Sequence, residues 1–171
     1  GIRVSSIPDA PSPAVAAITI GNMLNESRDL PSVDRKMRSG IWQRVSGERI
    51  ANLVIGIIGT GRVGSRVLKH LQGFSPKQIL VNDLHPDNDL YKIYHAQHVD
   101  KETIYRQADI ITLHIPLTPE TRSLISLNEM VKMKKNVVLI VSGVVILLLA
   151  VLLAVPVLFK DALLEKTKST I

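Results

Sequence analysis

The sequence predicts an α/β protein built on a Rossmann-type parallel sheet with helices on both faces. A long helix is expected before the sheet and an apolar segment after it. Three observations predict this fold class. Short apolar runs alternate with helical patterns between residues 53 and 141, as in strands buried on both faces of a parallel sheet. A glycine-rich turn follows the first run, and an aspartate follows the second, as in dinucleotide-binding βαβ units.

The elements before the sheet are expected to be a loop, a long helix and a connector. Residues 2–6 are typical of the end of a strand, and three prolines predict an extended loop over residues 7–13. Residues 14–39 have helical spacing, and Pro31 is expected to break or kink this helix. Its buried face is expected to consist of Ala14, Val15, Ile18, Met23 and Leu24. Residues 40–52 form the connector.

Strand and helix patterns alternate strictly over residues 53–141. The runs expected to be strands are residues 53–58, 79–81, 110–114 and 137–141. The segments expected to be helices are residues 63–71, 101–107 and 127–133. Because a helix separates each apolar run from the next, the strands are expected to be parallel and covered on both faces.

The C-terminal apolar segment allows two interpretations. Residues 137–159 are 23 residues without a charge, long enough as a helix to cross a bilayer core of about 30 Å. If residues 137–141 stay in the sheet instead, residues 144–159 alone are too short to span. A membrane anchor through 137–159 and an apolar cap on the sheet therefore both remain open. A frame error or gene rearrangement after codon 140 would also explain the abrupt change in composition.

The composition excludes several classes of protein. Hydrophobic residues make up 46% of the 171 residues and charged residues 21%, so the chain as a whole is not disordered. It has no cysteine, which excludes disulfides and cysteine-ligated zinc and agrees with a reducing, cytoplasmic location. The net charge of +6 is scattered and aromatic residues are only 4%, so no nucleic-acid partner is expected. The chain begins at Gly1 without a visible signal peptide, and we expect it to be part of a longer protein.

A G-x-G-x-x-G motif lies between the first expected strand and the helix that follows it. Its residues, all expected to bind a cofactor, are Gly59, Thr60, Gly61, Arg62, Val63 and Gly64. The first glycine permits a tight turn, the second lets the backbone approach a pyrophosphate, and the third lets the helix pack closely on the strand. The N-terminus of the helix offers N–H groups and a partial positive charge to the phosphates.

Asp83 follows the second expected strand, 19 residues after Gly64. A carboxylate at this position can accept hydrogen bonds from both hydroxyls of an adenosine ribose and would repel a 2′-phosphate. The motif and Asp83 together predict a dinucleotide site that prefers NAD(H). The alternative is a glycine turn and a strand-end aspartate that bind no ligand.

Several separated segments together resemble the D-isomer-specific 2-hydroxyacid dehydrogenases, such as phosphoglycerate dehydrogenase. Residues 55–64 resemble the cofactor motif of that family. The segments that resemble later parts of the family, in the same order, are residues 108–122, 124–128 and 133–140. Residues 14–16 with Thr19, and residues 40–42, are similar to the family's interdomain helix and connector. Ala17 departs from this similarity, because the family usually has a glutamate there.

The resemblance implies roles for individual residues and a division into domains. NAD is the implied cofactor, with Arg62 and Val63 against the pyrophosphate and Asp83 on the ribose. Ile115 and Pro116 would line the pocket and Thr121 would support their loop. Residues 1–52 would be the end of the substrate domain, the interdomain helix and the connector. Residues 53–141 would be the NAD-binding domain and residues 142–171 a divergent apolar segment with a polar tail. A homodimer through the helix of residues 14–39 is plausible by resemblance.

No catalytic residue and no metal ligand is expected in this chain. The family would place a substrate-binding arginine soon after residue 140, and a glutamate and a histidine much later, but no arginine and no histidine follows these segments here. His114 suits proton transfer by its type, yet a structural role or a pocket wall is expected. His95 and His98 have the spacing of two metal ligands without an evident third, so a solvated helix or loop is expected.

The expected function is therefore that of the NAD-binding domain of a 2-hydroxyacid dehydrogenase. Such an enzyme transfers a hydride between NAD(H) and a 2-hydroxy or 2-oxo acid, which only a full-length form would bind, and this chain alone is expected to be inactive. The alternative is a non-catalytic NAD(H)-binding module, either free or tethered to a membrane through the apolar tail.

Overall fold

The computed structural model describes residues 9–141, which lie within one compact unit, Gly1–Val141. Its centre is a five-stranded sheet in the order β3-β2-β1-β4-β5, with every neighbouring pair parallel. The strands are β1 Val54–Ile58, β2 Gln78–Asn82, β3 Ala96–His98, β4 Ile110–Leu113 and β5 Val138–Val141. The expected parallel sheet is confirmed. The expected strand end at residues 2–6 and the segment 142–171 lie outside the described residues.

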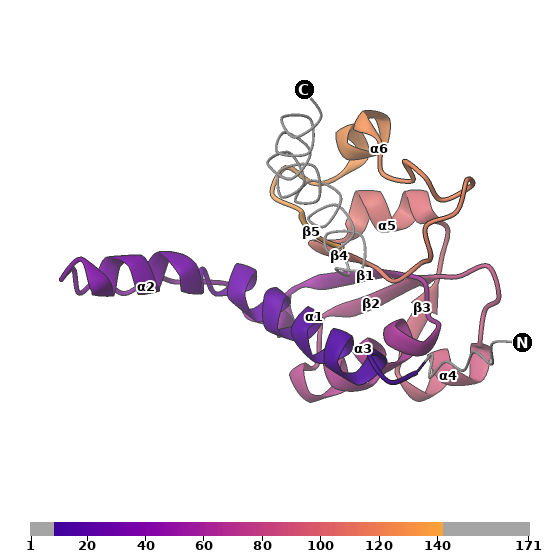
Figure 1. Cartoon of the computed structure of the whole chain (residues 1–171), viewed down its shortest axis with the longest axis horizontal. Helices are drawn as coiled ribbons and strands as arrows, with labels where there is room; N and C mark the ends of the chain where they lie inside the picture. The colour runs from indigo at the N-terminus through magenta and orange to yellow at the C-terminus, as the bar shows by residue number, and fades with distance from the viewer. Residues whose placement is uncertain (1–8, 142–171) are drawn as a thin grey trace, which may run out of the picture. The chain divides into compact units, whose positions relative to one another are not determined.

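Helices cover both faces of this sheet, as the sequence predicts (Figure 1). They are α1 Ser12–Ser27, α2 Leu30–Arg38, α3 Arg62–Leu71, α4 Asn88–Ile93, α5 Lys101–Gln107 and α6 Leu127–Lys132. Short 3-10 turns occupy Ile50–Asn52 and Gln72–Phe74. Helices α1 and α3 pack together on one face, and α5 lies on the other. Helix α2 buries none of its residues and extends away from the sheet (Figure 1).

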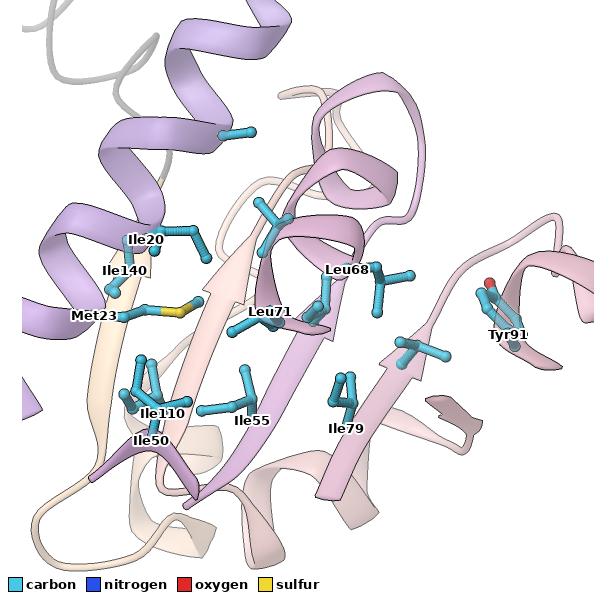
Figure 2. Close-up of a cluster of buried hydrophobic side chains, with 14 residues drawn as sticks. Ile20, Met23, Ile50, Ile55, Leu68, Leu71, Ile79, Tyr91, Ile110 and Ile140 are labelled. Atoms are coloured by element: carbon cyan, nitrogen blue, oxygen red, sulfur yellow. The ribbon is translucent and has the colours of Figure 1, made fainter. Parts of the chain in front are cut away.

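Alternate side chains of the strands fill two separate cores. Ile55 and Ile57 of β1 face the cluster that includes Met23 of α1 and Leu68 of α3 (Figure 2). Val54 and Ile58 face the opposite cluster, which α5 covers with Ile104 and Tyr105. The period of two along β1 thus supplies an apolar side chain to each face, as expected for a strand buried on both sides.

Two predictions for the N-terminal region are wrong. The loop predicted for residues 7–13 ends earlier, because α1 begins at Ser12 and Pro13 lies in its first turn, where a missing N–H costs nothing. The buried face of α1 is as expected for Met23, which is fully buried, but not for Ala14, which is exposed, or Ile18, which is 61% exposed. The side chains that α1 buries are Ser12, Ala16, Thr19, Ile20 and Met23.

The buried face of α1 combines the small side chains of Ala16 and Thr19 with the larger ones of Ile20 and Met23. Helix α1 packs along α3, and small side chains let two helices approach each other. Thr19 satisfies its hydroxyl by donating to the backbone oxygen of Val15, 2.8 Å away, so its burial leaves no polar group unpaired. The predicted break at Pro31 is confirmed, since α1 ends at Ser27 and Pro31 lies in the first turn of α2.

The sequence prediction missed α4 and β3. Helix α4 has six residues and begins at the N-cap Asp87, whose carboxylate accepts a hydrogen bond from the Leu90 N–H. Strand β3 has three residues and pairs with β2. The solvated helix or loop expected for His98 is wrong, because His98 lies in β3, beside Val81 of β2.

The strand interpretation is confirmed for the start of the C-terminal apolar segment. Val138–Val141 form β5, which pairs with β4 from Ile110 to Leu113. A membrane helix over residues 137–159 is therefore wrong for the part that forms this strand, and residues 142–159 lie outside the described part. Within residues 9–141 the structure has no helix that is long and apolar enough to cross a membrane.

Candidate dinucleotide-binding site

The glycine motif forms the turn that connects β1 to α3. The backbone of Gly59 has φ +93°, a conformation that glycine adopts without strain. A β-carbon at this position would lie 2.6 Å from the backbone oxygen of His114. The Gly59 N–H also donates to the backbone oxygen of Asn82 at 2.8 Å. Glycine is thus needed at position 59 both for the positive φ and because a side chain would clash with the backbone of His114 after β4.

The other two glycines of the motif differ sharply in their surroundings. A β-carbon on Gly64 would lie 2.0 Å from the backbone oxygen of Gly59, so only glycine allows α3 to sit this close to the turn. A β-carbon on Gly61 would meet no atom within 4 Å. Packing therefore does not explain Gly61, and its open side leaves the space that a phosphate needs to approach the backbone.

Asp83 lies against this turn, directly after β2. One carboxylate oxygen accepts from the Thr60 N–H at 2.5 Å and from the Thr60 hydroxyl at 3.1 Å, and the other accepts from the His85 N–H at 2.9 Å. Burial by itself raises the pKa of Asp83, but the N–H groups of His85 and Thr60, the Thr60 hydroxyl and the nearby His85 ring together hold this pKa below its usual value. The carboxylate is consequently ionised at neutral pH and can only accept hydrogen bonds.

A loop after β4 forms the other side of the turn. A β-carbon on Gly59 would lie 2.8 Å from the side chain of Ile115, which places Ile115 next to the glycine motif. The Thr121 hydroxyl donates to the backbone oxygen of Pro116 at 2.6 Å and accepts from the Thr118 N–H at 2.7 Å. Thr121 thus holds the loop that begins at Ile115 and Pro116. The predicted site residues from Gly59 to Gly64, Asp83 and Ile115 come together at one edge of the sheet.

His114 lies at the start of this loop, with its N–H donating to Ile58 and its ring Nε2 3.0 Å from the Thr112 hydroxyl. Burial lowers the pKa of His114 to about 4, so the ring is neutral at neutral pH. A base this weak is poorly matched to proton transfer near pH 7. These features disfavour His114 as a general base, and a structural role or a pocket wall stays the prediction for it.

Tyr91 is a residue of this region that the sequence analysis missed. It lies on α4 with 3% of its surface exposed, and its hydroxyl is 2.8 Å from the hydroxyl of Thr60. The ring of His98 stacks on Tyr91, with 5.9 Å between the ring centroids and 4° between the planes. No sequence signal marks this pair, because the tyrosine is 31 residues from Thr60 and α4 itself was not predicted. Among residues 9–141, no group of three or more histidine, aspartate or glutamate side chains could hold a metal ion.

The sheet order, the glycine turn at the end of β1 and the carboxylate at the end of β2 define the class of Rossmann dinucleotide-binding domains. A comparison with protein families matches residues 20–143 to the D-isomer specific 2-hydroxyacid dehydrogenase, NAD binding domain. The chain belongs to this family and comprises its NAD-binding domain.

Curated relatives and solved structures agree with this family. The chain is 32% identical to the hydroxypyruvate reductase of Thermotoga maritima over 142 residues, which cover 82% of this chain and 45% of that protein. It is 34% identical to the D-3-phosphoglycerate dehydrogenase of Methanocaldococcus jannaschii over 143 residues, 82% of this chain and 27% of that protein. The NAD complex of a D-isomer specific 2-hydroxyacid dehydrogenase from Lactobacillus delbrueckii ssp. bulgaricus is 26% identical with a TM-score of 0.68, and the match covers 76% of this chain and 40% of that chain. The chain thus spans less than half the length of each.

Proposed function

We propose that the turn between β1 and α3 holds NAD(H) for hydride transfer between the cofactor and a 2-hydroxy or 2-oxo acid in the whole enzyme. The observation that carries this proposal is the contrast between the glycines. Gly59 and Gly64 have no room for a β-carbon, whereas Gly61 faces open space beside an ionised Asp83. The cofactor supplies the hydride chemistry, and the chain binds and orients it.

In this proposal, different residues around the turn contact different parts of the cofactor. The backbone N–H groups of Arg62 and Val63, in the first turn of the ten-residue helix α3, point to the pyrophosphate together with the positive end of the helix dipole. The open side of Gly61 lets the phosphates approach. Ile115 and Pro116 line the pocket on the side of β4, and Thr121 fixes their loop through its hydrogen bond to Pro116.

Asp83 binds the adenosine ribose and selects NAD(H) over NADP(H) in this proposal. One carboxylate oxygen accepts two hydrogen bonds from Thr60. The other accepts one from the His85 N–H, and its second lone pair can accept a hydrogen bond from a ribose hydroxyl. A 2′-phosphate at the same place would put two negative charges side by side, which costs about 1–4 kcal/mol at a separation of about 4 Å near a protein surface.

Replacing Asp83 with alanine is expected to weaken NADH binding about tenfold or more, since a hydrogen bond to a charged group contributes about 1.5–3 kcal/mol. NADPH binding is expected to change little or to improve, because the repulsive charge is gone. The measurement is a titration that follows the fluorescence of each reduced cofactor, since Trp42 is 87% exposed and is a poor reporter of the site. Asp83→Asn, which keeps the shape and removes the charge, is the matched variant for NADPH. Equal affinity of the parent chain for both cofactors would contradict the proposed role.

The alternative function is an NAD(H)-binding module without turnover. One sequence observation favours it: after β5 the chain has Ser142 and Gly143 and no cation before Lys160, although the family resemblance implies a substrate-binding arginine in this region. Both functions share the NAD(H) site, and steady consumption of NADH with a 2-oxo acid by the full-length protein distinguishes the enzyme from the module.

We also propose, from the family resemblance, that two copies of the chain associate through the helices over residues 14–39. Ile18 of α1 is 61% exposed, and Leu30 and Met37 of α2 are 45% and 49% exposed. Apolar side chains that gather on neighbouring exposed helices are typical of interaction surfaces. The cytoplasmic location and a membrane tether through the residues that follow β5 stay predictions.

Replacing Ile18 with glutamate is expected to shift the parent dimer towards monomer, because a charge would have to be buried in an apolar interface. Sedimentation velocity of the parent and the variant at equal concentrations measures this shift. The control is Ile93→Glu, which changes an exposed apolar residue on α4 and should leave the oligomeric state as it is. A monomeric parent chain would show that the proposed dimer is wrong.

A further inference from the structure

We propose that Tyr91 is a positioning residue for the cofactor, which orients the Asp83 carboxylate through the hydroxyl of Thr60. The inference deepens the NAD(H) site proposed above and rests on it. Three side chains from separate elements form one hydrogen-bonded chain: the Tyr91 hydroxyl of α4, the Thr60 hydroxyl of the glycine turn, and the carboxylate that follows β2. Their successive distances are 2.8 Å and 3.1 Å.

The chemistry of the three groups fixes the direction of the hydrogen bonds. The ionised carboxylate of Asp83 can only accept, so the single proton of the Thr60 hydroxyl points to Asp83. The Thr60 oxygen is then the acceptor for the Tyr91 hydroxyl. Tyrosine thus donates to threonine, and threonine donates to the carboxylate. In such a chain each bond polarises and strengthens the next.

The protein holds Tyr91 in place from several sides. Its N–H donates to the backbone oxygen of the N-cap Asp87 at 3.0 Å, in the first turn of α4. Its ring lies at the edge of the apolar cluster that contains Leu68 and Ile79 (Figure 2), and the ring of His98 stacks against it. The hydroxyl has little freedom to leave Thr60, so the position of α4 is transmitted to the glycine turn.

The hydroxyl of Tyr91 has no role in packing. A phenylalanine would fill the same place in the apolar cluster, whereas a buried hydroxyl is costly unless it is hydrogen-bonded. The benefit of tyrosine lies in the hydrogen bond to Thr60. That bond restrains the Thr60 hydroxyl in the rotamer that donates to Asp83, and so keeps the carboxylate oriented before the ribose arrives.

Replacing Tyr91 with phenylalanine is expected to weaken NADH binding about 2–10-fold, the range for one neutral hydrogen bond. NADPH binding should change less, so the preference for NADH narrows. Thr60→Val should weaken NADH binding at least as much, because it removes the hydrogen bonds to both Tyr91 and Asp83, and Thr60→Ser should bind like the parent chain because it keeps the hydroxyl. In the Asp83→Ala background, Tyr91→Phe should weaken NADH binding no further. Tyr94→Phe is the matched control, since Tyr94 packs on the same cluster and should leave NADH affinity unchanged.

Two results would overturn the inference. One is a Tyr91→Phe variant that binds NADH as tightly as the parent chain. The other is an equal loss of affinity with and without Asp83, which would show that Tyr91 acts on the fold in general. A further test needs no cofactor and measures the pKa of the Asp83 carboxyl by NMR. This pKa should rise in Tyr91→Phe and stay unchanged in Tyr94→Phe. A parent chain that binds no NADH, but whose Asp83 pKa responds to Tyr91→Phe, would refute the proposed NAD(H) site and leave the hydrogen-bonded chain intact.

Discussion

Replacing Gly64 with alanine is expected to lower the free energy of unfolding by about 3 kcal/mol or more. The added β-carbon would lie 2.0 Å from the backbone oxygen of Gly59 and 3.0 Å from its carbonyl carbon. Both atoms belong to the backbone of a buried turn, which cannot rotate away as a flexible side chain can. The methyl group must therefore push α3 off β1, and this separates Val67 and Leu68 of α3 from the apolar cluster on that face of the sheet.

Urea unfolding followed by circular dichroism measures this loss, with the midpoint and the slope compared between variants. Gly73→Ala is the matched control, because a β-carbon on Gly73 meets no atom within 4 Å and it lies in the 3-10 turn after α3. It should unfold close to the parent chain. If Gly64→Ala loses less than about 1 kcal/mol, the helix can move at little cost, and the close packing of α3 does not depend on this glycine.

The sequence predicted the central fold well because its signals are local and repeated. The apolar runs that became β1, β2, β4 and β5 alternate with helical patterns, so type and order could both be assigned. The motif from Gly59 to Gly64 could be recognised from its spacing alone. The turn, the approach of the phosphates and the contact between helix and strand each need a glycine at a fixed position.

The errors come from elements whose burial depends on partners distant in the sequence. Strand β3 has three residues, of which Gln97 and His98 are exposed, so its pattern alone does not differ from a loop. On α1 the expectation relied on the helical spacing of apolar residues, whereas in the structure, where α1 packs on α3, Ala16 and Thr19 are buried and Ile18 is exposed.

The hydrogen bonds around Asp83 could be predicted only in part. Sequence spacing placed Asp83 at the end of the strand beside the glycine turn, and that is where it lies. The contact with Thr60 spans 23 residues, and the contact from Thr60 to Tyr91 spans 31. The contact with Asp83 follows from the pairing of β1 with β2, whereas the contact with Tyr91 depends on how α4 returns to the turn. A spacing rule cannot contain that information, because the path of a short helix after a strand is set by packing.

Replacing Gly61 with valine is expected to weaken NADH binding about 100-fold or more, while the free energy of unfolding stays near that of the parent chain. In the ligand-free chain a β-carbon on Gly61 meets no atom within 4 Å, and its φ of −67° lies outside the positive range that favours glycine. The folded state therefore has room for the side chain. A phosphate in the same space would lose its hydrogen bonds to the backbone, each worth about 1.5–3 kcal/mol when one partner is charged.

Alanine and valine at position 61 differ in size, so comparing them distinguishes a steric block of the phosphates from a general loss of folding stability. Gly61→Ala should weaken binding less than Gly61→Val, because its smaller side chain fills less of the open space, and both should unfold at the parent's urea concentration. Gly64→Ala should instead lower mainly the free energy of unfolding rather than the affinity for NADH. Cofactor fluorescence titration and urea unfolding on the same samples measure the two quantities side by side. If Gly61→Val binds NADH as tightly as the parent chain, the phosphates do not lie over this glycine and the proposed position of the cofactor is wrong.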